Sequence, residues 1–153
     1  MRVRVYVGAV LIAWSGAVAL SGTHALAQGK VTTPEQLDKV MKQAGPTMRN
    51  MQAALKASNW ADIKKELATQ RQAIADSQSF WVEHKKDDAL KMNKESLAKI
   101  EALEKIVSTE PVDAAATAAA LKEVGGTCSA CHKQYRAQDA ENNYILKPGT
   151  IGG

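Results

Sequence analysis

Two cysteines and a histidine stand within five residues near the end of the chain. The stretch Cys128-Ser129-Ala130-Cys131-His132 is a C-x-x-C-H sequence, and it contains both cysteines of the chain. C-x-x-C-H is the sequence to which a c-type haem is attached. On a helix, Cys128 and His132 lie one turn apart on one face, so two thioethers can fix the porphyrin edge while the imidazole reaches the iron. The spacing therefore predicts one covalent haem c, attached through Cys128 and Cys131, with His132 as an iron ligand.

Three other interpretations of the cysteine pair are open. A thioredoxin-like redox pair requires a βαβ context, which the sequence does not show. A structural zinc site requires four ligands, and the chain without its N-terminal segment has a single further histidine, His84. The third interpretation is a pair of buried, inert cysteines that matches the attachment sequence by accident. We expect haem attachment in preference to all three.

The N-terminal residues have the pattern of a secretory signal peptide. Arg2 and Arg4 precede an apolar run over residues 5–20, and Ala25-Leu26-Ala27 provides a small-x-small cleavage site. The run is shorter than a stable membrane span of ~20 residues, and an uncleaved membrane anchor is the alternative interpretation. We therefore expect residues 1–27 to be removed on export, most simply to a bacterial periplasm, with no stable membrane insertion afterwards.

The balance of charge argues against a nucleic-acid partner. The 153-residue chain has a formal net charge of +4, and loss of Arg2 and Arg4 with the signal peptide lowers it to +2. The other Lys and Arg residues are interleaved with Asp and Glu and form no basic patch. The sequence also shows no Ser-His-Asp set, phosphate-binding loop or second metal-binding cluster, so we do not expect an enzyme.

Four stretches of the chain repeat apolar residues at helical spacing, and none alternates as a strand does. The chain is poor in aromatic residues (5%) and rich in alanine, which favours helices over strands. The first stretch begins at Thr33-Pro34, and Gly45-Pro46 inside it predicts a bend or a helix in two pieces. Asn59 is suited to cap the second stretch and Asp113 the fourth.

The apolar stripes of these stretches predict which faces are buried. They consist of Leu37, Val40, Met41, Ala44, Met48, Met51 and Leu55; of Trp60, Ile63, Leu67 and Ile74; of Leu90, Leu97, Ile100, Leu103, Ile106 and Val107; and of Ala118, Leu121, Val124, Cys128, Cys131 and Tyr135. Residues 77–88 could continue the second helix or form a turn. Four amphipathic helices with short connections predict an all-α, antiparallel four-helix bundle with a covalently bound haem over residues 28–138. Residues 139–153 form a C-terminal tail, which we expect to be a loosely ordered extension.

The sequence resembles the class II cytochromes c, the cytochrome c′ family. The stretch from Gly125 to Arg136 has a small residue before the motif and then the family's C-x-x-C-H-x-x-Y-R pattern. The resemblance covers about residues 33–137, although outside this motif it is mainly one of architecture. It implies an exported four-helix bundle with a haem packed in its core and His132 as the proximal iron ligand.

The resemblance suggests two further residues near the haem. The family's distal residue comes from the first helix, near its N-terminus, where this chain has Met41. Members with methionine there are similar to low-spin, six-coordinate electron carriers, whereas members with an apolar non-ligand are five-coordinate and bind NO or CO. A methionine on this stripe also suits core packing, which is what we expect of Met48. Arg136 matches an arginine near the proximal haem face.

Three functions follow from these predictions. The first is a periplasmic monohaem carrier that transfers single electrons between periplasmic redox proteins and is not an enzyme, with His132 and Met41 binding the iron. The second is a five-coordinate protein that binds NO or CO, as the cytochrome c′ family does. The third is a c-type domain that serves as partner or subunit of a periplasmic oxidoreductase. A homodimer through the first two helices is an expectation from the family alone.

Overall fold

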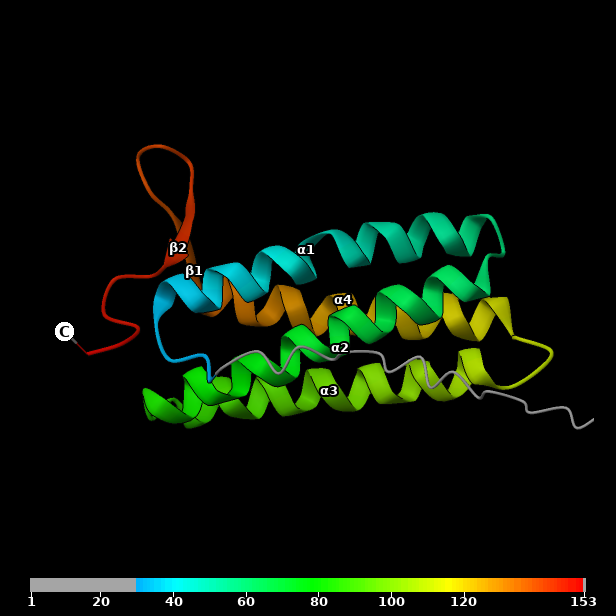
Figure 1. Cartoon of the computed structure of the whole chain (residues 1–153), viewed down its shortest axis with the longest axis horizontal. Coiled ribbons are helices and arrows are strands. Elements are labelled where there is room, and N and C mark those ends of the chain that lie inside the picture. Colours follow the sequence, from blue (N-terminus) through cyan, green and yellow to red (C-terminus); the bar gives the residue numbers. More distant parts are fainter. Residues whose placement is uncertain (1–29, 153) are drawn as a thin grey trace, which may run out of the picture.

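The chain folds into four long helices followed by a small β-hairpin (Figure 1). A computed structural model describes residues 30–152, and the predicted signal peptide lies outside them. The elements in this part of the chain are α1 (Pro34–Lys56), α2 (Trp60–Glu83), α3 (Asp87–Ser108), α4 (Ala114–Tyr135), β1 (Arg136–Gln138) and β2 (Tyr144–Leu146). Consecutive helices pack side by side, and α4 also contacts α1. The predicted all-α, antiparallel four-helix bundle is confirmed.

Short polar side chains begin three of the helices. The Thr33 side chain accepts a hydrogen bond from the N–H of Gln36, and the Gln36 side chain accepts one from the N–H of Thr33, which together form a capping box. The side chains of Asn59 and Asp113 accept hydrogen bonds from the first turns of α2 and α4, at 3.2 and 2.9 Å. Each cap satisfies an N–H that has no partner inside its helix. These three predicted helix starts are confirmed.

The two ambiguous stretches of the sequence are resolved. α1 is one helix with Pro46 inside it, and its axis changes direction near its middle in Figure 1, as expected where a proline removes a helical hydrogen bond. In residues 77–88, α2 continues to Glu83, a turn follows, and α3 begins at Asp87. Phe80 and Trp81 are buried on the last turn of α2.

The core consists of two clusters along the bundle. One, the hairpin-end cluster, lies where α1 begins and α4 ends, and the other, the far-end cluster, lies further along the bundle. Met41 packs against both clusters. The hairpin-end cluster consists of Val31, Leu37, Val40, Ala44, Ala73, Phe80, Trp81, Ala89 and Tyr135. The far-end cluster consists of Met51, Ala54, Ile63, Leu67, Ile74, Ile100, Leu103, Val107, Leu121 and Val124. Among residues 30–152, no helix is both long enough and apolar enough to cross a membrane.

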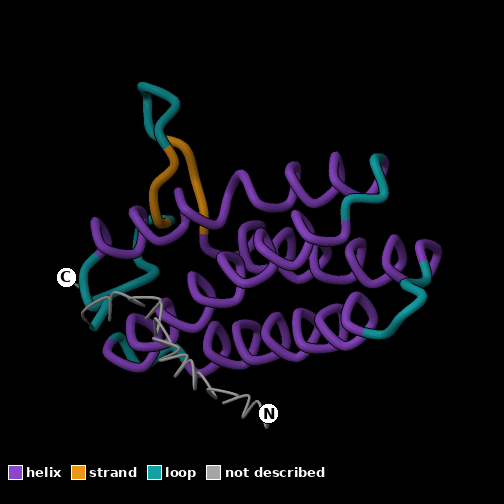
Figure 2. Tube along the Cα trace, turned by 45° about the vertical axis from the view of Figure 1, so that its right-hand side comes forward, coloured by secondary structure: helices purple, strands orange, loops and turns teal. Residues whose placement is uncertain are grey.

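The C-terminal segment is not the loosely ordered extension that we expected. β1 and β2 pair as antiparallel strands across the predicted boundary at residue 138 (Figure 2). The N–H of Lys147 donates to the carbonyl of Tyr135 at 2.8 Å, and Thr150 is buried. Leu146 and Ile151 pack against the hairpin-end cluster. These contacts fasten the segment to the bundle and place it beside the end of α4.

Candidate functional site

Helix α4 brings the two cysteines and the histidine to one face. Cys128, Cys131 and His132 occupy positions i, i+3 and i+4 of a helix that continues to Tyr135, and all three are half-buried. Sγ of Cys128 accepts a hydrogen bond of 3.8 Å from Nε2 of Gln70 on α2, and Cys131 packs against the hairpin-end cluster. The predicted attachment and ligand residues therefore lie together on the inner side of α4.

Burial determines the protonation of these groups. Burial raises the pKa of the Cys128 thiol, and it raises the pKa of Cys131 to about 11, with smaller effects from Cys128 and Asp88. Burial lowers the pKa of His132, and the positive charge of Arg136 lowers it further. Near pH 7 both thiols are therefore protonated and the imidazole is neutral, with a lone pair that can bind a metal ion.

Helix geometry predicts that Met41 lies near the level of His132 on the neighbouring helix. A Cβ added at Gly125 of α4 would lie 3.3 Å from Cε of Met48, so α1 and α4 approach closely between these two residues. The two helices run antiparallel (Figure 1). A step of about 10.5 Å along each helix, two turns, therefore leads from Met48 to Met41 and from Gly125 to His132. Met41 and Cys131 also contact the same hairpin-end cluster.

Arg136 lies just past α4 and not one turn further along it. α4 ends at Tyr135, and Arg136 begins β1 with its guanidinium carbon 4.1 Å from the centroid of the Tyr144 ring, a cation–π contact. The backbone N–H of Arg136 donates to the carbonyl of His132, and the positive charge of Arg136 helps to lower the pKa of the His132 imidazole. The role of Arg136 beside a haem stays a prediction.

Sequence reasoning missed two buried polar residues beside the cysteines. Gln70 of α2 and Thr47 of α1 are each 1% exposed. The Thr47 hydroxyl contacts one end of the Gln70 amide, and the other end reaches Cys128. One signal was present in the sequence, because Gln70 interrupts the apolar stripe of α2 between Leu67 and Ile74.

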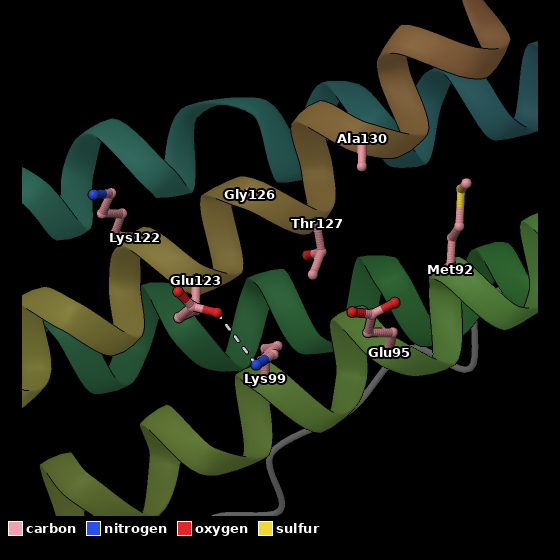
Figure 3. A pocket seen from close by; sticks show the side chains of 8 residues that line it. All are labelled: Met92, Glu95, Lys99, Lys122, Glu123, Gly126, Thr127 and Ala130. Atoms are coloured by element: carbon pink, nitrogen blue, oxygen red, sulfur yellow. Dashed lines mark hydrogen bonds and ion pairs between the residues drawn. The ribbon is translucent and has the colours of Figure 1, made fainter.

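A cleft of about 320 Å³ lies between α3 and α4 (Figure 3). Lys99 of α3 and Glu123 of α4 form an ion pair of 3.2 Å in its wall. Successive helical residues are rotated by about 100°, so Gly126 and Ala130, which also line the cleft, lie on the opposite side of α4 from Cys128. The cleft is therefore on the outer face of α4 and does not contain the predicted site residues.

The residues on the inner face fit a covalently attached haem. Two protonated thiols at positions i and i+3 are placed for two thioether bonds, and the neutral imidazole that follows the second thiol is placed to bind the iron. The hairpin-end cluster offers apolar side chains beside them. On the facing helix, the Met41 thioether is a soft, uncharged donor of the kind that binds haem iron.

Comparison with known proteins points to the same segment. Residues 77–136 match the family model described as Cytochrome C'. This cytochrome c′ match covers the last turns of α2 and all of α3 and α4, so it includes Cys128, Cys131 and His132 but not Met41. Members of the cytochrome c′ family bind covalently attached haem c, and the match supports a c-type haem cytochrome, in agreement with the attachment sequence. No curated protein and no solved structure matches the chain.

Proposed function

We propose that the chain is a monohaem c-type cytochrome that transfers single electrons. Cys128 and Cys131 would hold the haem through thioethers, and His132 and Met41 would bind its iron. The observation that supports this proposal most directly is the close approach of antiparallel α1 and α4 at Met48 and Gly125, from which helix geometry predicts that Met41 and His132 lie near one level. The cytochrome c′ match supports the c-type haem. It does not bear on the distal ligand, because the matched segment does not include α1.

Each residue of the site has a separate task in this proposal. A haem bound here supplies a one-electron ferric/ferrous couple. Cys128 and Cys131 would hold the haem by addition of their thiols across its two vinyl groups, in which each thiol would supply both the sulfur and the proton, so that attachment would consume no oxidant. His132, neutral near pH 7, offers a nitrogen lone pair. The Met41 thioether is a soft ligand of the kind that raises the reduction potential.

The second candidate is a five-coordinate protein that binds NO or CO. The cytochrome c′ match is equally consistent with it, because the matched segment leaves out Met41. Met41 is half-buried and packs against both core clusters, as a core side chain would. In this candidate function, Met41 packs as a core residue and does not bind the iron.

The proposed location of the protein is the periplasm, where other redox proteins would be its electron donors and acceptors. The N-terminal signal pattern supports this, and members of the cytochrome c′ family are typically periplasmic. A role as partner or subunit of a periplasmic oxidoreductase, and a homodimer through α1 and α2, belong to the same proposal and come from the family resemblance.

Covalent haem content tests the haem attachment. The protein is produced in a periplasm that matures c-type cytochromes, and the haem that stays on the chain after denaturation is measured. We expect Cys128→Ala and Cys131→Ala each to keep at most one thioether, and the double variant to lose all covalent haem. Ser129→Ala, between the two cysteines and exposed, should keep normal attachment. Wild-type protein that releases its haem on denaturation contradicts the proposal.

The absorption spectrum of the ferrous protein separates the two candidate functions. Sharp low-spin bands are expected if Met41 binds the iron. A high-spin spectrum that changes at once when CO is added overturns the electron-carrier ligation and supports the gas-binding candidate.

A further inference from the structure

Gln70 places a carboxamide in the apolar centre of the bundle. It is 1% exposed, as is Leu67 one turn before it on α2. A buried amide is costly unless both of its ends have hydrogen-bond partners. Both ends of Gln70 have one: Oε1 contacts the hydroxyl of Thr47, and Nε2 lies 3.8 Å from Sγ of Cys128. The amide therefore bridges α1 and α4 at the first attachment cysteine.

The hydroxyl of Thr47 restricts how this bridge is arranged. Besides Oε1 of Gln70, Oγ1 of Thr47 lies 2.7 Å from the carbonyl oxygen of Ala44. A hydroxyl has a single proton, so Thr47 donates to one of these two oxygens at a time. When Thr47 donates to Gln70, Nε2 of the amide faces Cys128. When Thr47 donates to Ala44, the amide turns over, Nε2 donates to Thr47, and Oε1 faces Cys128.

The chemical state of Cys128 selects between these two arrangements. A thiol has a proton and can donate to Oε1 or accept from Nε2, so it suits both. A thioether has no proton on sulfur and can only accept. Once Cys128 is part of a thioether, only the arrangement with Nε2 facing sulfur leaves neither end of the buried amide unpaired.

From the hydrogen-bond donors and acceptors of these groups, and building on the proposed haem attachment, we infer that Gln70 is a positioning residue for the haem-bound sulfur of Cys128. Thr47 donates to Oε1 of Gln70, and Nε2 of Gln70 donates to the thioether sulfur. The donated N–H places partial positive charge beside a haem substituent, which favours the ferrous state, since hydrogen bonding around the cofactor is one of the means by which a protein tunes a haem potential. Attachment thus fixes an amide that has two orientations in the chain before attachment.

Two variants remove the bridge from opposite ends. Gln70→Met has nearly the same length and no N–H, and it leaves Thr47 free to donate to Ala44, so no buried group loses its partner. Thr47→Val has nearly the same shape and removes the hydroxyl that orients the amide. Asn93→Leu is the matched control, because Asn93 is another buried amide, 6% exposed, whose Nδ2 donates to the Ile74 carbonyl and the Ser77 hydroxyl of α2.

The experiment measures the reduction potential of the haem-loaded proteins by equilibration with redox mediators. We expect Gln70→Met to shift the ferric/ferrous ratio at a fixed potential towards ferric by up to about fivefold, Thr47→Val to shift it less in the same direction, and Asn93→Leu to leave it unchanged. In ¹⁵N-labelled wild-type protein, the side-chain N–H protons of Gln70 should exchange slowly with solvent, and in Thr47→Val they should exchange faster.

Covalent haem content, measured first, separates failure of this inference from failure of the proposed function. Wild-type protein without covalent haem contradicts the proposed function. Haem-loaded Gln70→Met with an unchanged potential overturns the role of Gln70 alone, as does a shift of equal size in Asn93→Leu, which would show a general loss of packing. If Gln70→Met does not fold, the potential and the amide exchange of Thr47→Val decide by the same criteria.

Discussion

Met41 and Met48 lie two turns apart on α1 and form a matched pair for testing iron ligation. Both are half-buried methionines of one helix, and Met41 is the one that helix geometry predicts at the level of His132. We expect Met41→Ala to convert a low-spin ferrous spectrum into a high-spin one that responds to CO, because it removes the sixth ligand. Met48→Ala should stay low-spin, because it removes a thioether beside Gly125. Absorption spectra of the reduced proteins with and without CO measure both.

The spectra of this pair are informative because both variants remove a half-buried thioether that packs against the far-end cluster. A general loosening of the bundle would change both proteins, whereas loss of a ligand changes one. A low-spin spectrum that survives Met41→Ala removes Met41 from the site. A spectrum that changes only in Met48→Ala transfers the ligand role to Met48.

The residues that carry the chemistry could be predicted because their spacing is local. Cys128 and His132 share a face of any α-helix, so no other part of the chain is needed to bring them together. Gln70 could be noted only as a polar interruption of an apolar stripe. Its partners Thr47 and Cys128 are 23 and 58 residues away in the sequence, and only the packing of three helices brings them to it.

The starts of the helices depend on residues that are local in the sequence, whereas the end of α4 depends on residues further along the chain. Thr33, Asn59 and Asp113 cap their own helices, so the helix starts could be predicted. No glycine or proline directly follows Tyr135. α4 ends there because residues 136–138 pair with residues 144–146 and the N–H of Lys147 donates a hydrogen bond to the carbonyl of Tyr135. Strands of three residues are too short to show alternation, so the sequence did not reveal the hairpin.

Adjacent residues of β2 test how much the hairpin contributes to the fold. Leu146 packs against the hairpin-end cluster, whereas Ile145 is 41% exposed. We expect Leu146→Ala to lower the free energy of unfolding by about 1–2 kcal/mol, because it removes apolar contacts between the hairpin and the bundle. Ile145→Ala should change it by less than about 0.5 kcal/mol. Urea denaturation followed by circular dichroism measures both, and equal effects would show that the hairpin does not pack on the bundle in solution.

Among the residues that the structure describes, the buried aromatic rings gather at one end of the bundle, whereas the half-buried Trp60 packs against the far-end cluster. The Phe80 and Trp81 ring centroids are 5.0 Å apart, and those of Trp81 and Tyr135 are 5.2 Å apart. The fully buried members of the far-end cluster include no aromatic ring. The buried rings therefore mark the end of the molecule where Cys131 and His132 also lie. A composition poor in aromatic residues does not indicate a uniformly aliphatic core, because position along the bundle decides where the rings pack.

Acid stability is a property of the whole fold, because the carboxyl groups that determine it are spread over all of it. In residues 30–152, several carboxyl groups at or near the surface have their pKa held below the ordinary range, in each case mainly by a hydrogen bond. They are Glu35, Glu83, Asp88, Glu101 and Asp139, bonded to Thr33, Lys30, Tyr135, Lys105 and Asn143 respectively. The Glu101–Lys105 contact lies within α3, and the others lie at helix ends, in loops or in the hairpin.

The sign of the pH dependence follows from the direction of these pKa shifts. A carboxyl with a lower pKa in the folded chain binds fewer protons there, so its stabilising effect is present above the unfolded value and is lost as the pH falls through the folded value. The ordinary values are 3.8 for Asp and 4.5 for Glu. We therefore expect the melting temperature to fall slightly from pH 7 to about pH 5, because His132, whose pKa is lowered by burial, takes up a proton more readily in the unfolded chain, and to fall further below about pH 5 as the carboxyl groups titrate. Asp88→Asn and Asp139→Asn should each make the fall shallower, because an amide does not titrate. Thermal denaturation followed by circular dichroism between about pH 2 and pH 7 measures this, and a melting temperature that stays level into strong acid, or an unchanged slope in both variants, contradicts it.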